Sequence, residues 1–377
     1  MAGIYIHIPF CRKACHYCDF HFSTSLKTKE KVLSAIVTEL CTRTSEIKGQ
    51  AVETIYFGGG TPSLLSYDEL HSILSALQRE YEIIQHPEVT LEANPEDITP
   101  EALNHWKNLG FNRLSIGIQS FNEEILTWMN RAHDAKQALE CVPLAQDAGF
   151  GNISIDLIYG VPHRTSVQWK EEVTKALALN TTHISAYCLT IEPQTAFGAR
   201  AQKGEVLSSP NAQSADEYAA LIALGRKHEM LPYEISNFSK PGFISQHNTN
   251  YWRGQSYLGI GPGAHSYVNG KRSWNVSHNV KYAKGIHDLD SISESEVLSI
   301  KDQYNEYIMT GLRQYKGVEL EYIQHAFSCD LLSMFSGVID SYSSSGHLTH
   351  TDGHLKLTEK GILLADRIAS DLFQTND

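Results

Sequence analysis

Three cysteines lie close together near the start of the chain, at Cys11, Cys15 and Cys18. They follow directly on an apolar stretch, residues 4–8, that predicts a strand. All three thiols therefore lie on one loop at the C-terminal end of that strand, which is the face where α/β barrels carry their chemistry. An electron-transfer [4Fe–4S] cluster generally takes four cysteine thiolates. Three would leave one iron without a protein ligand, so the spacing predicts a cluster that is open to a small molecule.

Zinc is the alternative for this loop. A structural zinc usually takes paired cysteines, or a Cys/His set with a second pair some distance away, whereas this loop offers one group of three. His16 and His21 keep zinc open, although we favour the cluster. A disulfide fits less well, because three neighbouring thiols cannot all pair within one chain. We interpret the four scattered cysteines as buried apolar thiols: Cys41, Cys141, Cys188 and Cys329.

A glycine run follows the second apolar stretch, in the segment Phe57-Gly58-Gly59-Gly60-Thr61-Pro62. Residues without a side chain let the backbone approach a ligand closely and adopt positive φ. A tight turn is the alternative interpretation. The run lies at the same predicted barrel face as the cysteines, which favours a ligand-binding loop.

Polar residues also mark the ends of three further predicted strands, at Glu92, Gln119 and Asp156. Burying such a group is costly unless something pairs with it. Each alone could cap a helix, but three at successive strand ends favour a shared site. Arg131 could neutralise a ligand carboxylate through its planar guanidinium, or could form a surface salt bridge.

The elements that must position these residues follow from hydrophobic patterning. Six short apolar stretches predict buried strands, at residues 4–8, 52–57, 89–92, 113–118, 153–158 and 183–187. Helical spacing falls between them, at about residues 27–46, 66–81, 100–109, 135–148 and 165–179. This βα alternation predicts an α/β fold with a parallel sheet, and right-handed crossovers would curl six strands into a partial (β/α)6 barrel.

The later part of the chain has a different pattern. We expect a helix near residues 214–228 and a connecting layer against the open side of the barrel. Helices from about residue 293, a hairpin at Asp352-Gly353 and a last helix over 360–372 predict a winged-helix-like C-terminal domain. The resulting division is a barrel at 1–235, a connecting segment at 236–291 and a C-terminal domain at 292–377.

Composition restricts the partners and the location. The chain has 31 basic and 43 acidic residues, which gives a net charge of −12. We therefore do not expect nucleic acid as a partner. The sequence has no secretory signal pattern and no apolar run long enough to span a bilayer. These features predict a cytoplasmic protein, with membrane contact at most peripheral, at the inner face.

The pattern CxxxCxYC after a strand resembles the signature of the radical-SAM superfamily. In that superfamily the open iron binds the amino and carboxylate groups of S-adenosylmethionine, and one-electron reduction cleaves the sulfonium to a 5′-deoxyadenosyl radical. The resemblance thus implies a reductant as a partner. It also implies which residues surround S-adenosylmethionine: Tyr5, Tyr17, Gly59, Gly60, Thr61, Glu92, Gln119, Arg131 and Asp156.

Over residues 3 to about 375 the chain resembles the oxygen-independent coproporphyrinogen III oxidase group. The matching segments are 5–11, 58–62, 91–95, 115–121, 155–162 and 258–266. True oxidases of this group have a cysteine two residues after the third ligand, where this chain has Phe20, and an extension before the first strand. Both departures resemble the HemW-like heme chaperone branch, whose members bind heme and deliver it to acceptors such as respiratory enzymes.

The segment His247-Asn248-Thr249-Asn250-Tyr251-Trp252 matches the HNxxYW motif of that branch. An imidazole can ligate heme iron and aromatic rings can cover a macrocycle face. The resemblance therefore implies heme handling by His247, Tyr251 and Trp252, while His265 stays an alternative ligand. It also implies monomer–dimer exchange. The alternative function is that of an enzyme, the radical-SAM oxidative decarboxylation of coproporphyrinogen III.

Overall fold

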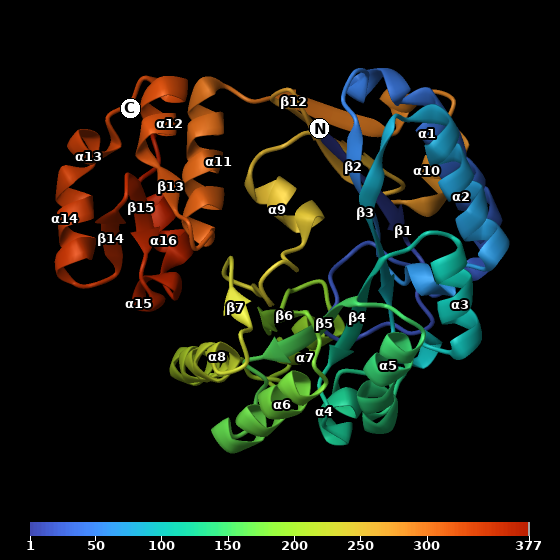
Figure 1. The fold of residues 1–377 in the computed structure, drawn as a ribbon, viewed down its shortest axis with the longest axis horizontal. Coiled ribbons are helices and arrows are strands. Elements are labelled where there is room, and N and C mark those ends of the chain that lie inside the picture. The colour runs from blue at the N-terminus through green and yellow to red at the C-terminus, as the bar shows by residue number, and fades with distance from the viewer. Residues whose placement is uncertain (376–377) are drawn as a thin grey trace.

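Six parallel strands form the centre of the protein, in a computed structural model that describes residues 1–375 (Figure 1). Each pairs with the next one along the chain. They are β1 (Ala2–Ile8), β2 (Val52–Gly59), β3 (Ile83–Ala93), β4 (Arg113–Gln119), β5 (Asn152–Tyr159) and β6 (His183–Cys188). All six predicted strands are present, so the prediction of an α/β fold with a six-stranded parallel sheet, curled as a partial barrel, is confirmed.

Helices follow these strands and cover the outer face of the sheet (Figure 1). They are α1 (Lys29–Thr42), α2 (Tyr67–Glu80), α3 (Pro100–Asn108), α4 (Glu123–Trp128), α5 (Ala135–Asp147) and α6 (Ser166–Ala178). Capping boxes fix where three of them begin, at Ser66, Asp134 and Thr165. Apolar strand side chains such as Ile4 and Ile6 are fully buried in the core beneath the helices. The βα alternation that the sequence predicts is therefore correct.

The sheet continues beyond the six strands on both sides. Next to β1 lies β9 (Tyr257–Ile260), which is parallel to it, and antiparallel strands β10 (His265–Val268), β11 (Lys271–Asn275) and β12 (Ser293–Val297) follow. Next to β6 lie β8 (Asn237–Ser239) and β7 (Leu231–Pro232). The sequence predicted a connecting layer here and missed these strands. The domain boundaries at 235 and 291 stay predictions.

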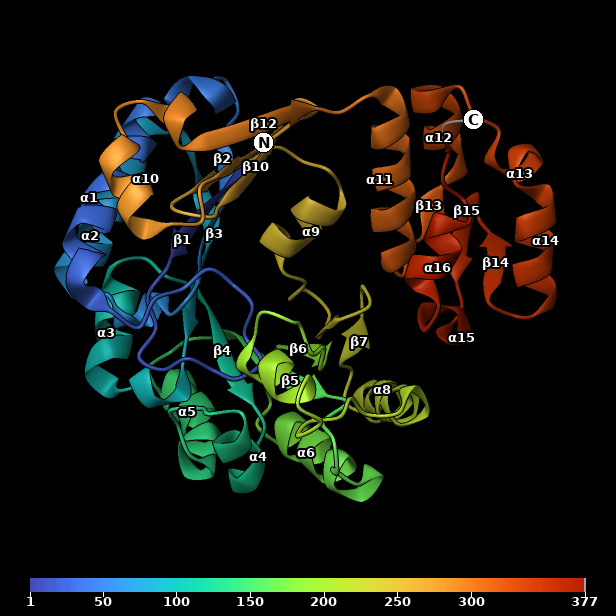
Figure 2. The same ribbon diagram turned by 180° about the vertical axis from the view of Figure 1, so that it is seen from behind.

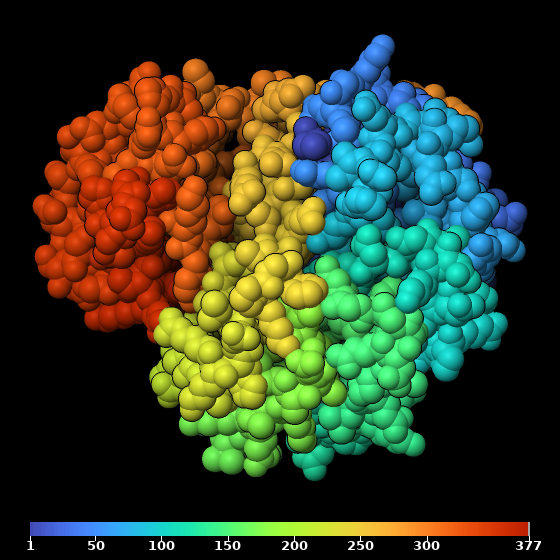
Figure 3. All heavy atoms as spheres, in the orientation of Figure 1, coloured from blue at the N-terminus to red at the C-terminus, as the bar shows by residue number. Residues whose placement is uncertain are grey.

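Four further helices belong to this part of the chain: α7 (Ala196–Ala201), α8 (Asn211–Arg226), α9 (Gln246–Trp252) and α10 (Asn279–Gly285). Helix α9 contacts β2 and lies between the barrel and the C-terminal domain (Figure 2). Its first backbone N–H groups, those of Gln246 and His247, donate to the carboxylate of Glu88. On the face seen in Figure 3, this yellow segment fills the surface between the two parts.

The C-terminal part has its own apolar core around residues such as Tyr304 and Ile308. Its elements are α11 (Ile300–Arg313), β13 (Val318–Glu319), α12 (Leu320–Phe327), α13 (Leu331–Met334), α14 (Ser336–Ser344), β14 (Leu348–Thr351), β15 (His354–Leu357), α15 (Glu359–Ile362) and α16 (Ala365–Ser370). The predicted hairpin turn is present, with positive φ at Asp352 and Gly353. The single last helix predicted over 360–372 is instead two short helices.

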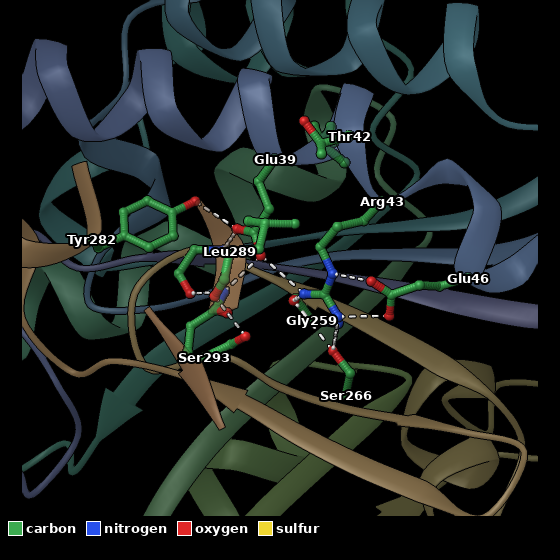
Figure 4. A network of polar contacts seen from close by, with 12 residues as sticks. Glu39, Thr42, Arg43, Glu46, Gly259, Ser266, Tyr282, Leu289 and Ser293 are labelled. Atoms are coloured by element: carbon green, nitrogen blue, oxygen red, sulfur yellow. Dashed lines mark hydrogen bonds and ion pairs between the residues drawn. The ribbon is translucent and has the colours of Figure 1, made fainter. Parts of the chain in front are cut away.

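A buried polar network joins α1 to the later strands (Figure 4). The carboxylate of Glu39 is fully buried and accepts hydrogen bonds from Arg43, from the backbone N–H of Gly261, and from Asn275 and Tyr282. Every oxygen of this charge is thus paired, as burial requires. The network fixes the first helix to a segment more than two hundred residues later. Within residues 1–375, no helix has the length and apolarity that crossing a membrane requires.

Candidate functional site

The cysteine loop leaves β1 and is held at both of its ends. Phe10 forms a β-bridge with Ser23, and the backbone N–H of Cys11 donates to the carbonyl of Ser23 at 3.0 Å. Within the loop, the N–H of Cys18 donates to the carbonyl of Cys15 at 3.3 Å. All three cysteines line one cavity of about 700 Å³ at the C-terminal ends of the strands. The loop is therefore positioned on the barrel face that the sequence predicted.

Burial favours the protonated form of two thiols of this loop, those of Cys11 and Cys18. Burial raises the pKa of Cys11 to about 11, although a hydrogen bond with Thr61 opposes the shift. Burial also raises the pKa of Cys18 to about 12. Iron must displace these protons on binding, so loading of the site should release acid.

The two histidines near the loop are engaged elsewhere. His16 Nδ1 lies 2.8 Å from the carbonyl of Trp128, and His21 Nε2 lies 2.7 Å from Oδ1 of Asn279. Across residues 1–375, no group of three His, Cys, Asp or Glu side chains is arranged to hold a single metal ion. In an iron–sulfur cluster the cysteines bind different iron atoms, so they need not converge on one ion. The donor set of this loop fits a cluster better than zinc.

The glycine loop packs directly against the start of the cysteine loop. A Cβ atom on Gly60 would lie 2.7 Å from the carbonyl oxygen of Phe10 and 2.8 Å from that of Ile8. Gly59 has a φ of 104°, and its N–H donates to Glu92 at 3.1 Å. Only glycine permits both the conformation and the close approach. Gly59, Gly60 and Thr61 all line the large cavity.

Two half-buried carboxylates face the same cavity. Burial raises the pKa of Glu92 to about 7, and the hydroxyl of Tyr56, which donates to it at 2.7 Å, opposes the shift. Burial likewise raises the pKa of Asp156 to about 6, against hydrogen bonds from Ser185 and Ser115. Carboxylates held in this way gain most from a cationic ligand, and the sulfonium and ammonium groups of S-adenosylmethionine are cationic.

Arg131 and Gln119 complete the inner wall. Arg131 donates to the Sγ of Cys15 and the hydroxyl of Tyr17, both at 3.3 Å, and to Asn94 at 2.6 Å. Gln119 ends β4 with a φ of 67°, which is uncommon for a residue with a side chain. Backbone strain of this kind clusters at functional sites. Tyr17, Gln119, Arg131 and the carboxylates thus surround the cysteines.

The remaining predicted residues lie deeper in the barrel or outside it. Tyr5, His247 and Tyr251 line a second cavity of about 210 Å³, which shares Glu92 with the first. Trp252 lines neither cavity. Both ring nitrogens of His247 are engaged, Nδ1 with Thr54 and Nε2 with Tyr251, each at 2.8 Å. The structure therefore does not bring the HNxxYW side chains to the cysteines.

Sequence reasoning missed Tyr56 and Arg113, which also line the second cavity. Arg113 is 2% exposed and its Nε has no hydrogen-bond partner. The signal was the alternation of polar and apolar side chains along the strands, as at Arg113 and Ser115 of β4, whose side chains share one face. The interior of this barrel is polar, and that polar face continues from the large cavity to α9.

The other cysteines only partly match their predicted burial. Cys141 and Cys329 are buried, but Cys41 is half-buried and Cys188 is exposed at the large cavity. Cys188 ends the last strand of the barrel, where the sheet gives way to a loop. The expectation of a buried thiol was wrong for this residue.

Comparison with known proteins first identifies the superfamily to which the chain belongs. The Radical SAM superfamily matches residues 5–175, and the HemN C-terminal domain matches residues 298–364. The solved coproporphyrinogen III oxidase HemN from Escherichia coli superposes with a TM-score of 0.86, covering 99% of this chain and 90% of that one at 21% identity. At this identity the likeness is one of fold alone. The fold and the cysteine loop together define a radical-SAM protein.

Relatives with higher identity narrow the assignment. The heme chaperone HemW of Bacillus subtilis is 33% identical, with 98% of each chain covered. The heme chaperone HemW of Escherichia coli is 32% identical, with 97% of this chain and 96% of that chain covered. This chain belongs to the HemW family of heme chaperones. The alternative function, that of a coproporphyrinogen III oxidase, is not favoured, because the solved oxidase is similar to this chain in fold alone.

Proposed function

We propose that this protein is a heme chaperone that binds heme and transfers it to acceptor proteins, and that it carries a [4Fe–4S] cluster and S-adenosylmethionine. The observation that carries the proposal is the cavity of about 700 Å³, which has the cysteines on its wall and reaches the C-terminal domain at Arg313 and Asp366. Its size falls within the range of small-molecule sites.

The inner part of the cavity would hold the cluster and S-adenosylmethionine. Cys11, Cys15 and Cys18 would bind the cluster, which with S-adenosylmethionine supplies one-electron reductive chemistry when loaded. Glu92 and Asp156 would hold the cationic groups of the ligand, and the glycine loop, whose Gly59 N–H donates to Glu92, would hold that carboxylate in place. The role of the chain is thus to bind and orient the cofactors and to exclude water.

The outer part of the cavity is suited to a planar apolar ligand with acidic groups. Phe20 is 68% exposed and Tyr187 is 46% exposed, and both line the cavity. Arg12 and Arg313 lie on its wall and could pair with heme propionates. The HNxxYW residues His247, Tyr251 and Trp252 stay predicted heme residues. Direct ligation by His247 requires its ring to leave Thr54 or Tyr251.

Heme titration of the anaerobically reconstituted full-length protein tests the proposal. We expect saturable binding of one heme per chain, followed by transfer to an apo-acceptor with the characteristic heme spectrum. Incubation with reductant, S-adenosylmethionine and coproporphyrinogen III tests the alternative. Protoporphyrinogen formation, or no heme binding at all, would overturn the chaperone assignment.

Several parts of the proposal rest on the family resemblance and on composition. These are the delivery of heme to respiratory enzymes, the need for a reductant, homodimer formation, and a cytoplasmic location with at most peripheral membrane contact. Sedimentation with and without heme tests the dimer, and fractionation of cells tests the location.

A further inference from the structure

The HNxxYW helix closes the barrel at the end opposite to the cysteine loop. Gly3 and Thr54 lie near the N-terminal ends of β1 and β2, and His247 packs against both. A Cβ atom on Gly3 would lie 2.8 Å from Thr54 Oγ1 and 3.3 Å from His247 Cε1, so the glycine makes room for the imidazole. The cysteines follow the other end of β1, about 16 Å further at the usual rise per residue.

The imidazole of His247 is fixed and neutral. It is 3% exposed, and Thr54 and Tyr251 hold its two nitrogens. Burial lowers the pKa of His247 to about 3, and the charge of Arg113 adds to the shift. A ring held on both sides can serve as a rigid support for its neighbours.

Stacked rings and hydrogen bonds lead from this imidazole to the cofactor face. The ring of Tyr56 stacks on His247, with centroids 5.1 Å apart and planes at 23°. The hydroxyl of Tyr56 then donates to Oε1 of Glu92 at 2.7 Å, and Oε2 of Glu92 accepts from the N–H of Gly59 at 3.1 Å. Each step along this path is a direct contact.

The path is also closely packed. A Cβ atom on Gly58 would lie 2.8 Å from the ring of Tyr56 and 3.0 Å from both Glu92 and Tyr5. The ring of Tyr56 and the carboxylate of Glu92 therefore both lie directly against the backbone at Gly58. A change in the position of His247 should reach Glu92 through this ring.

We infer that His247 is a positioning residue for the S-adenosylmethionine site, acting through Tyr56 on the carboxylate of Glu92. The inference rests on the proposed binding of S-adenosylmethionine, and it gives His247 a role other than ligation of heme. Substitutions at the barrel end opposite to the cysteines should therefore change cofactor binding at the cluster face.

Binding of S-adenosylmethionine to anaerobically reconstituted full-length protein tests this. The readouts are the dissociation constant from equilibrium dialysis and the change that the ligand causes in the electron paramagnetic resonance spectrum of the reduced cluster. Tyr56→Phe removes the hydrogen bond that orients Glu92, whose charged form a cationic ligand would favour, and should weaken binding about tenfold or more. His247→Ala should also weaken binding, with iron content unchanged.

A double-mutant cycle separates positioning from general destabilisation. If His247 acts through Tyr56, the effects of His247→Ala and Tyr56→Phe on binding are not additive. Asn250→Ala is the matched control, because Asn250 lies on the same helix but bonds to Glu53, at 3.0 Å, and should leave the affinity unchanged. Thr54→Val has nearly the same shape as the wild-type residue and removes one hydrogen bond of His247. If His247→Ala does not fold, this variant replaces it, and it should also bind S-adenosylmethionine more weakly than the wild type.

The outcomes are distinct. Additive effects, or His247→Ala and Thr54→Val proteins with the affinity of the wild type, would overturn the inference and leave the proposed function intact. Loss of heme binding in His247→Ala with unchanged S-adenosylmethionine affinity would overturn it in favour of heme ligation. A wild-type protein that binds no S-adenosylmethionine would overturn both.

Discussion

The guanidinium of Arg131 lies 3.3 Å from the Sγ of Cys15, and its second terminal nitrogen lies 2.7 Å from the carbonyl oxygen of Gly117 in β4. One half-buried side chain thus connects the cysteine loop to the barrel wall. The sequence identified this arginine as a candidate for neutralising a ligand carboxylate. In the structure it also positions the loop.

Replacing Arg131 with Met should therefore both destabilise the protein and disturb the loop. The carbonyl of Gly117 and the amide oxygen of Asn94 would lose a charged hydrogen-bond donor, which costs about 1.5–3 kcal/mol. Urea unfolding of the apoprotein gives the loss of stability. Arg253→Met, at an exposed arginine, should leave the unfolding midpoint unchanged. Equal midpoints for the two variants would contradict this account.

Replacing Cys15 with Ala should remove the cluster and leave the barrel folded, because the loop lies outside the apolar core. Iron and acid-labile sulfide after reconstitution should fall to background, while the far-ultraviolet circular dichroism stays that of the wild type. Cys41→Ala is the control, since Cys41 lies on α1 beside Arg79, away from the cavity. Unchanged iron in the Cys15 variant would refute the cluster assignment.

Replacing Gly60 with Ala should separate the glycine loop from the cysteine loop. The new methyl group would meet backbone atoms of Ile8 and Phe10, which cannot move aside as a flexible side chain can. Overpacking of this kind costs about 1–3 kcal/mol, and cluster content should fall as well. Gly151→Ala is the matched control, because a Cβ atom there would meet nothing within 4 Å. Thermal unfolding and iron analysis of both variants test the prediction. Equal unfolding temperatures and equal iron contents for the two variants would contradict it.

Replacing Glu92 with Gln should change how stability depends on pH. The folded protein holds the Glu92 proton up to about pH 7, whereas the unfolded chain releases it near the ordinary pKa of 4.5. Because the folded state binds more protons in this window, wild-type stability falls as pH rises through it, by up to about 3 kcal/mol.

The Gln variant lacks this contribution. The difference in free energy of unfolding between wild type and Glu92→Gln should therefore move in favour of the variant from pH 4.5 to pH 7. Urea titrations of the apoprotein at several pH values measure it. A constant difference across the window would mean that Glu92 is not held protonated by burial.

Replacing Glu39 with Gln should destabilise the whole protein. The guanidinium of Arg43 would keep its burial and lose a charged partner, which costs about 3–5 kcal/mol. Glu46→Gln is the comparison, because Glu46 pairs with the same arginine but its side chain is 38% exposed, and its loss should cost less than about 1 kcal/mol. Similar losses for the two variants would argue against the buried network as a source of stability.

The sequence predicted those parts of the fold that have a strong local pattern. The six parallel strands are β-branched and apolar, and capping residues such as Ser66 and Thr165 mark where helices begin. The strands β9 to β12 were missed because they are short and, beyond β9, rich in polar residues. They pair only with β1 or with one another. Such pairing is a tertiary effect that local propensity does not contain.

The residues of the candidate site likewise fall into those that a local sequence pattern predicts and those that contacts across the fold position. The cysteine spacing and the glycine run are local in sequence, and the structure brings both to one cavity. The place of His247 depends on Glu88 capping α9 and on Gly3 leaving space, which are contacts across the fold. No spacing within the HNxxYW motif could predict that its histidine faces Tyr56.

The parallel pairing of β1 with β9 has a consequence for synthesis of the protein on the ribosome. The first strand leaves the exit tunnel early, but the neighbour that covers one of its edges, Tyr257–Ile260, is made about 250 residues later. At ordinary elongation rates this delay is roughly 12 to 50 seconds. During that time the nascent chain exposes an apolar strand with unpaired backbone groups, so productive folding should depend on protection by ribosome-associated factors.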